Sequence, residues 1–207
     1  MKYNLTLNAD YSLEGTIEIV YYDYSAANFR TNFAQYNSNE AFLNAYSENK
    51  VGLSVIDFTL NNKDSVIKPL QIIYNVRIDN AVTEVDNELY INPCLFEQMK
   101  QNPFNEETRN YPIDFAYKTD RTVTVTIKIP ENLTISQLPK AALIKMSDNT
   151  AKYQHNVTVN ENSIQLYSKF NLDNYIYLQT IYPEFREFFN LIVKKNAELV
   201  VLTKKSN

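Results

Sequence analysis

Apolar and polar residues alternate with a period of two along most of the chain, a pattern that predicts strands with one buried face. The alternation occupies residues 3–7 and returns in residues 13–24 after a polar turn, so we expect these segments to form a hairpin. A second hairpin is expected from residues 153–159 and 164–172, which flank a polar turn at residues 160–163. The same pattern predicts further strands at residues 51–60, 70–78, 89–91, 123–129, 143–146 and 199–202.

One of these strands contains a change of phase. Apolar residues occupy odd positions as far as Val55 and even positions from Ile56 to Leu60. Because successive side chains point to opposite faces of a strand, an extra residue is needed to keep both apolar sets on one face. The sequence therefore predicts a β-bulge next to Val55.

A helix is expected in residues 25–46, where Phe29, Phe33 and Phe42 belong to an apolar set at helical spacing. Ser25 can cap its start, because a serine hydroxyl accepts a hydrogen bond from a free backbone N–H. A short polar break at residues 37–39 divides this helix into two parts.

The C-terminal helix is expected in residues 183–196. Pro183 suits a first helical turn, and acidic residues near the start and lysines near the end match the helix dipole. Phe185 and Phe188 belong to an apolar stripe that we expect to pack against a sheet. Residues 203–207 are expected to fray.

Residues 95–99 between these two helices suit one short helix. The loop from Pro103 to Pro112 is expected to be irregular, with Phe104 as its apolar anchor. With only two glycines in the chain, we expect Asn and Asp to carry most of the turns.

Strand patterns outnumber helical ones and are joined by short loops, which favours antiparallel pairing. We therefore expect a mainly β (α+β) fold, an antiparallel β-sandwich-like domain with two principal helices, one of them near the C-terminus. Residues 1–207 are expected to form one β-rich module, which can be subdivided into residues 1–86 and residues 87–207.

Charge and hydropathy argue against two kinds of partner. The net charge is -4 and no run of Lys or Arg exceeds a pair, so no surface for a phosphate backbone is expected. No apolar stretch approaches the ~20 residues that cross a bilayer. The first residues also lack the charged and apolar segments of a secretory signal. We expect neither nucleic acid binding nor a membrane span.

The chain has one cysteine and one histidine, Cys94 and His155. In one interpretation Cys94 begins a helix whose dipole lowers the thiol pKa, and His155 is its base. In the alternative, which we favour, Cys94 is a small core residue and His155 is a side chain of the sheet. A third, orienting group is not evident, so no catalytic residue is predicted.

Acidic residues offer a second possible site. Asp114, Asp120, Glu106 and Glu107 could be a carboxylate pair or a calcium site, but the Asp-x-Asp-x-Asp-Gly spacing does not occur. We expect solvated loop charges, and therefore no metal and no cofactor. The 16 tyrosines suit core and cross-strand positions better than a glycan or peptide platform.

Several segments resemble a known family. They are residues 89–93 (Leu-Tyr-Ile-Asn-Pro), 102–104 (Asn-Pro-Phe), 111–115 (Tyr-Pro-Ile-Asp-Phe), 182–189 (Tyr-Pro-Glu-Phe-Arg-Glu-Phe-Phe) and 199–202 (Leu-Val-Val-Leu). Together they resemble the C-terminal region of bacterial transglutaminase-like multidomain proteins, whose last β-rich domain has no known function. The likeness is closer after residue 89 than before it.

The resemblance implies that catalysis and the role of this region belong to different domains of a longer polypeptide. Cys, His and Asp catalysis would belong to a transglutaminase-like (papain-like) core that precedes this region, in the periplasm or cell envelope. The leading hypothesis is thus a non-catalytic accessory module whose partner is that core. An independent cell-surface β-sandwich that binds an unknown protein or glycan is the second hypothesis, and a Cys-dependent enzyme is the third.

Overall fold

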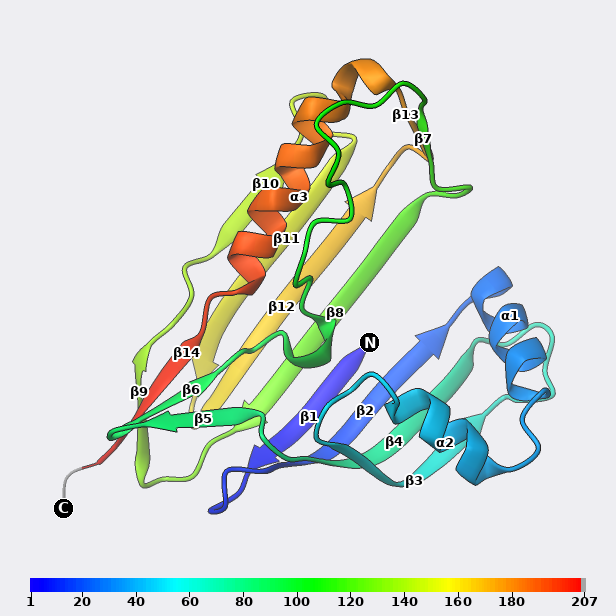
Figure 1. The fold of residues 1–207 in the computed structure, drawn as a ribbon. Coiled ribbons are helices and arrows are strands. Elements are labelled where there is room, and N and C mark those ends of the chain that lie inside the picture. Colours follow the sequence, from blue (N-terminus) through cyan, green and yellow to red (C-terminus); the bar gives the residue numbers. More distant parts are fainter. Residues whose placement is uncertain (206–207) are drawn as a thin grey trace.

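A computed structural model describes residues 1–205, and these form two layers (Figure 1). The first layer is one large twisted sheet. The second layer, which covers one face of it, contains a four-stranded sheet, a two-stranded sheet and the α-helices (Figure 1).

The large sheet has eight strands. Their spatial order is β10 (Ala142–Lys145), β11 (Ala151–Asn160), β12 (Ser163–Leu172), β8 (Thr119–Lys128), β1 (Lys2–Leu7), β2 (Leu13–Tyr21), β4 (Leu70–Ile78) and β3 (Leu53–Asn61). All neighbours pair antiparallel except β1 and β8, which are parallel. The sheet therefore joins strands from both sides of residue 86, and the division of the chain at that point stays a prediction.

The covering layer contains two further sheets and the helices. The small sheet has the order β5 (Val82–Val85), β6 (Glu88–Ile91), β14 (Val200–Lys204) and β9 (Leu133–Gln137), and β13 (Ile176–Tyr177) pairs with β7 (Ile113–Asp114). The helices are α1 (Asp23–Phe33), α2 (Asn39–Ser47) and α3 (Tyr182–Asn196), with 3-10 turns η1 (Leu95–Glu97) and η2 (Gln179–Ile181). Within residues 1–205, no helix combines the length and apolar character needed to cross a bilayer.

The expected fold class is confirmed, and so are both hairpins. β1 pairs with β2, and β11 pairs with β12 through Asn160 and Ser163. The phase change is also confirmed, because the register of β3 against β4 shifts between Val55 and Asp57. Ile56 was expected on the apolar face, but it is the extra residue and is exposed. The bulge lets Val55 and Phe58, on either side of it, both pack against the core.

Several boundaries expected from the sequence are wrong. The first helix begins at Asp23, and Tyr22 precedes it without a side-chain cap, so Ser25 is not the N-cap. Ser38 caps α2 instead, where its hydroxyl accepts from the backbone N–H of Ala41. Residues 95–99 contain only the single turn η1. Short strands β5, β7, β9 and β13 were missed, because two to five residues give too little alternation to recognise.

The C-terminal strand extends further than expected. β14 continues through Lys204, so the fraying expected from residue 203 onward is wrong for Thr203 and Lys204. Pairing with both β6 and β9 holds these residues in place. Residues 206 and 207 lie outside the described part of the chain.

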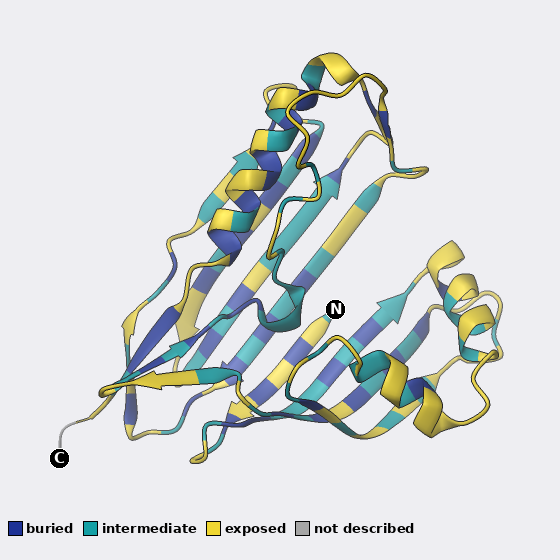
Figure 2. Ribbon diagram, viewed as in Figure 1, coloured by how far each residue is buried: buried dark blue, intermediate teal, exposed yellow. Residues whose placement is uncertain are grey.

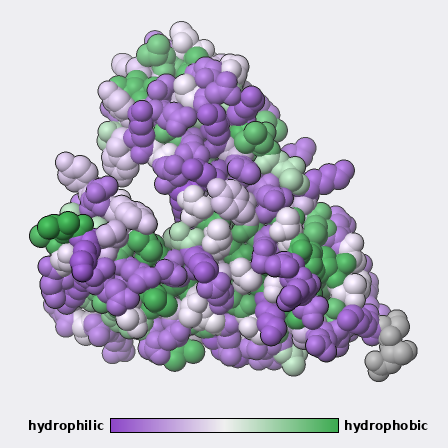
Figure 3. Space-filling view, turned by 180° about the vertical axis from the view of Figure 1, so that it is seen from behind, coloured by the Kyte–Doolittle hydropathy of each residue, from purple (hydrophilic) through white to green (hydrophobic). Residues whose placement is uncertain are grey.

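Burial follows the alternation along each strand of the large sheet (Figure 2). One face carries the core, while the opposite face, seen from behind in Figure 3, is covered mostly by hydrophilic side chains. On β8, for example, Val123 and Val125 are buried, whereas Thr122 and Thr124 on the other face remain half-buried. An antiparallel sheet with one solvated face has this pattern.

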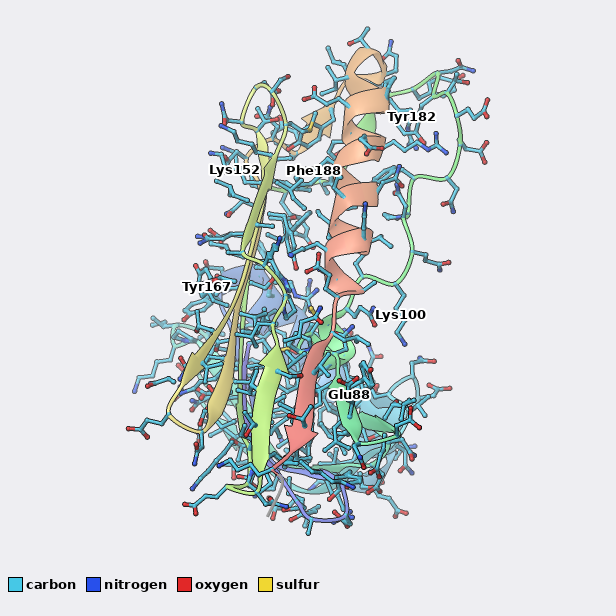
Figure 4. All side chains as sticks on the ribbon, turned by 90° about the vertical axis from the view of Figure 1, so that its left-hand side faces the viewer. Glu88, Lys100, Lys152, Tyr167, Tyr182 and Phe188 are labelled. Carbon is cyan, nitrogen blue, oxygen red and sulfur yellow. The ribbon has the colours of Figure 1, made fainter. Side chains whose placement is uncertain are left out.

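The expected packing of α3 is confirmed. Phe185 and Phe188 are 0% and 3% exposed, and the ring of Phe188 lies 6.2 Å from that of Phe170 on β12. Figure 4 shows Phe188 on the side of α3 that faces the strands. Phe104 anchors the irregular loop as expected, with its ring centroid 5.0 Å from Phe185 and 4.9 Å from Phe189.

Candidate functional site

A cavity of about 230 Å³ lies between α3 and the large sheet. β8, β11 and β12 provide its floor, and α3 provides its roof together with η1 and the loop that follows it. Its apolar walls consist of Met99, Phe115, Val123, Leu166, Phe170, Leu172, Phe189 and Ile192. Its polar groups come from Cys94, Glu97, Thr119, Arg121, Tyr153, Ser168 and Asn196.

The hydroxyl of Tyr153 is the centre of a polar cluster at one wall. It accepts hydrogen bonds from Asn196 Nδ2 at 2.6 Å and from Ser168 Oγ at 3.1 Å, and it lies 3.2 Å from Nδ1 of His155. The Oδ1 atom of Asn196 accepts from the backbone N–H of Met99 at 3.0 Å. These bonds tie the end of α3 to the sheet and to the loop after η1.

His155 is almost fully buried beside this cluster, at 1% exposure. Since the Tyr153 hydroxyl accepts from two neighbours, its own proton is available for Nδ1, and the neutral imidazole then carries its proton on Nε2. That Nε2 atom has no hydrogen-bond partner among residues 1–205. Burial, and secondarily the nearby charge of Lys195, lowers the His155 pKa to about 4. His155 is therefore neutral at physiological pH.

Cys94 borders the cavity and is 3% exposed. Burial, reinforced by the negative charge of Glu97, raises the pKa of its thiol to about 12. The interpretation in which a helix dipole lowers this pKa needs a longer helix, whereas only the single turn η1 follows Cys94. The position suits a small core residue, the interpretation favoured from the sequence.

The fold brings the regions of Cys94 and His155 closer than their sequence positions suggest. Tyr153 lines the same cavity as Cys94 and also contacts His155. Across the described residues, no hydrogen bond joins the thiol to the imidazole; the imidazole contacts Tyr153 instead. In the described chain the imidazole is therefore held by the hydroxyl of Tyr153 and not by the thiol.

Charged residues stand at the opening of the cavity. Arg121 is half exposed and forms an ion pair through Nη2 with Oε2 of Glu97, whose side chain is only 9% exposed. Glu97 Oε1 also accepts a hydrogen bond from the hydroxyl of Tyr3 at 2.6 Å. Burial, together with this negative charge, raises the pKa of Tyr3. Sequence analysis missed this pair, because 24 residues separate its members.

The acidic residues considered from the sequence are dispersed. Asp120 forms an ion pair with Lys169 at 3.2 Å, and Asp114 accepts from the backbone N–H of Ala116 at 2.7 Å. Glu106 and Glu107 are exposed in the loop. Throughout residues 1–205, no three His, Cys, Asp or Glu side chains gather as metal ligands would.

Tyrosines occupy both kinds of position considered from the sequence. Five of the most buried are Tyr3, Tyr74, Tyr153, Tyr177 and Tyr182. Others project into solvent, notably Tyr22, Tyr24, Tyr111, Tyr117 and Tyr175. Core packing therefore explains only part of the tyrosine content.

Residues 87–202 match a family described as a domain of unknown function with a solved structure, DUF3858. The match covers more than half of the chain. The chain belongs to the DUF3858 family. Every residue that lines the cavity lies within the DUF3858 region, whereas β1 to β4 and the helices α1 and α2 precede it.

No curated protein matches the chain. Among solved structures, a "putative protease" from Parabacteroides distasonis is similar over 47% of this chain and 19% of its own, with 13% sequence identity and a TM-score of 0.41. The likeness thus extends over a small part of that protein.

Proposed function

We propose that this DUF3858 protein is a non-catalytic accessory module that works beside a transglutaminase-like (papain-like) core of the same polypeptide in the bacterial cell envelope. The observation that carries this proposal is the state of Cys94. Its thiol is buried, its pKa is raised to about 12, and it has no hydrogen bond to His155 within the described chain.

Thiol catalysis requires the opposite arrangement. The nucleophile is a thiolate, activated by a positioned base or by a lowered pKa, and it must be reachable by substrate. At neutral pH Cys94 is protonated, and Nδ1 of His155 faces the hydroxyl of Tyr153. These observations support a module that leaves the chemistry to another domain.

The resemblance supports the context of the module. All five segments that resemble transglutaminase-like multidomain proteins lie in residues 89–202, almost the same region as the DUF3858 match. Several of them hold the roof of the cavity. Asn102, for example, donates from Nδ2 to the backbone carbonyl of Arg186 at 2.9 Å. Structural contacts of this kind support an accessory role for the region.

Activity measurements on the purified chain test the proposal. We expect no hydrolysis of peptides and no isopeptide crosslinking between a glutamine peptide and an amine, and Cys94→Ser should change neither result. Turnover that disappears in Cys94→Ser would overturn the proposal. The gene sequence next to this region supplies a separate test, because an adjoining Cys and His core supports the accessory role and a free-standing gene contradicts it.

A binding role for the exposed aromatic tip is the second candidate. Tyr111, Tyr117 and Tyr175 are 78%, 71% and 49% exposed. They lie on the loops next to β7 and β13, and the pairing of these two strands holds the loops side by side. The backbone N–H of Phe115 also donates to the carbonyl of Tyr175 at 2.8 Å. Exposed aromatic rings on paired loops suit a glycan or protein ligand.

Titration with soluble cell-wall oligosaccharides, followed by NMR, tests this second candidate. We expect shifts at the tip that Tyr117→Ala removes. Tyr24→Ala is the matched control, because Tyr24 is 88% exposed on α1 at a distance in sequence from the tip. Equal loss in both variants would contradict a site at the tip.

A further inference from the structure

We propose that the cavity under α3 binds a small amphipathic carboxylate, with the apolar body of the ligand in the cavity and its carboxylate at Arg121. This inference goes beyond the accessory role, because it assigns a ligand to the chain itself and holds whether or not a catalytic core adjoins it.

The volume and lining of the cavity indicate the size and chemical character of the ligand's apolar part. An apolar cavity of about 150 Å³ in another protein stays dry and binds benzene. The present cavity is larger, at about 230 Å³, and its walls include Phe115, Val123, Leu166 and Phe189. If each methylene occupies the ~30 Å³ of a water molecule, roughly eight carbons fit. A medium-length alkyl chain or a small ring system suits this volume.

The walls of the cavity belong to elements that pairing and hydrogen bonds hold in place. β8 and β12 are central strands of the large sheet, each paired on both sides. The end of α3 is held in place by the bonds of Asn196 to Tyr153 and to the backbone of Met99. A preformed cavity of this kind binds a ligand without the cost of ordering its walls.

Arg121 supplies the charge that selects a carboxylate. It precedes Val123 by two residues on β8, so both side chains lie on the face of the sheet that lines the cavity. Its guanidinium makes one side-chain hydrogen bond within residues 1–205, to Glu97, and has further N–H donors. Guanidinium groups pair with carboxylates through such parallel donors.

Glu97 does not compete for the remaining donors. Its side chain is nearly buried and already accepts from both Tyr3 and Arg121. The side chain of Arg121 is 52% exposed, so an incoming carboxylate can approach the guanidinium from the solvent side. The apolar body of the same molecule then extends inward along Val123 and Leu166.

Binding of octanoate to the full chain tests the proposal, with octan-1-ol as the uncharged comparison. We expect saturable binding of octanoate by calorimetry and a rise in Tm, with clearly weaker binding of the alcohol. Arg121→Gln should raise the dissociation constant of octanoate about tenfold, the value of one charge-assisted contact. Arg121→Lys should recover part of this loss, and Arg109→Gln, which changes an exposed loop arginine outside the cavity, should have no effect.

Methionine methyl groups report where the ligand binds. The chain has three methionines, of which Met99 lines the cavity while Met1 and Met146 do not. In spectra of protein labelled at methionine methyl groups, octanoate should shift the Met99 signal and leave the other two unchanged. This readout does not depend on the stability of any Arg121 variant.

Each outcome either supports or overturns the proposed carboxylate site. A specific Met99 shift with a tenfold effect of Arg121→Gln supports the proposal. Equal binding of the acid and the alcohol, equal binding by Arg121→Gln, a Met99 signal that does not move, or no binding at all would each overturn it. None of these results bears on whether the chain lacks catalytic activity, which is measured separately with peptide substrates.

Discussion

Asn196, the last residue of α3, donates a hydrogen bond from Nδ2 to the hydroxyl of Tyr153 on β11 across 2.6 Å. Forty-three residues separate the two side chains in sequence, and both line the cavity. The contact joins the covering layer to the large sheet at a buried position. Because Asn196 also accepts from the backbone of Met99, one side chain links three parts of the structure.

Replacing Asn196 by Ala should therefore destabilise the protein. The Tyr153 hydroxyl and the Met99 N–H would each lose a partner in a buried environment, which costs about 1–3 kcal/mol per group. We expect a decrease of about 2–4 kcal/mol in the free energy of unfolding, measured by urea denaturation. Lys194→Ala is the control, since Lys194 is exposed two residues earlier on the same helix. Equal effects of both changes would show that the network contributes nothing.

The aromatic stripe of α3 gives a second stability prediction. Phe185 is fully buried and its ring lies 4.6 Å from Tyr177 and 5.1 Å from Phe189. Phe185→Ala should reduce the free energy of unfolding by about 3–5 kcal/mol, because transfer energy is lost and a cavity is left. Leu191→Ala, at a position 42% exposed on the same helix, should cost less than about 1 kcal/mol. An unfolding curve that Phe185→Ala leaves unchanged would contradict the buried position of Phe185 in this helix.

His155 makes stability depend on pH. Its folded pKa is about 4, below the usual 6.5 of a histidine, so between these values the unfolded chain binds more protons than the folded chain. The contribution is fully present above pH 6.5 and is lost as pH falls towards 4. The loss is about 2–3 kcal/mol across this window.

Urea denaturation of the wild-type chain and of His155→Gln at several pH values isolates this effect from that of the carboxylates. The variant should show a flatter dependence between pH 4 and 6.5. Parallel curves for the two proteins would mean that His155 does not titrate as its burial indicates.

The thiol of Cys94 should be inert in the folded chain. With its pKa raised to about 12, almost none of it is thiolate at pH 7.5. Alkylation by iodoacetamide should proceed on the order of a thousandfold more slowly in native protein than in denaturant, where the pKa returns to about 8.5. Native labelling at the rate of the denatured chain would contradict both the burial of Cys94 and the non-catalytic assignment.

Local patterns in the sequence determined most of the elements of this protein. Alternation determined the two hairpins and β4, and the change of phase at Val55 determined the bulge in β3. The spacing of Phe185 and Phe188 determined the buried face of α3. These features are readable because burial of one face imposes a period on neighbouring residues.

Only the tertiary structure decided the order of the strands and the site. The parallel pairing of β1 with β8, the ion pair of Arg121 with Glu97 and the contact of Asn196 with Tyr153 join residues 24 to more than 120 positions apart. No local period records such contacts, because they arise from loop closure and from the fit between the two layers. The cavity, likewise, is a property of that fit, and the same apolar residues would read as ordinary core in the sequence.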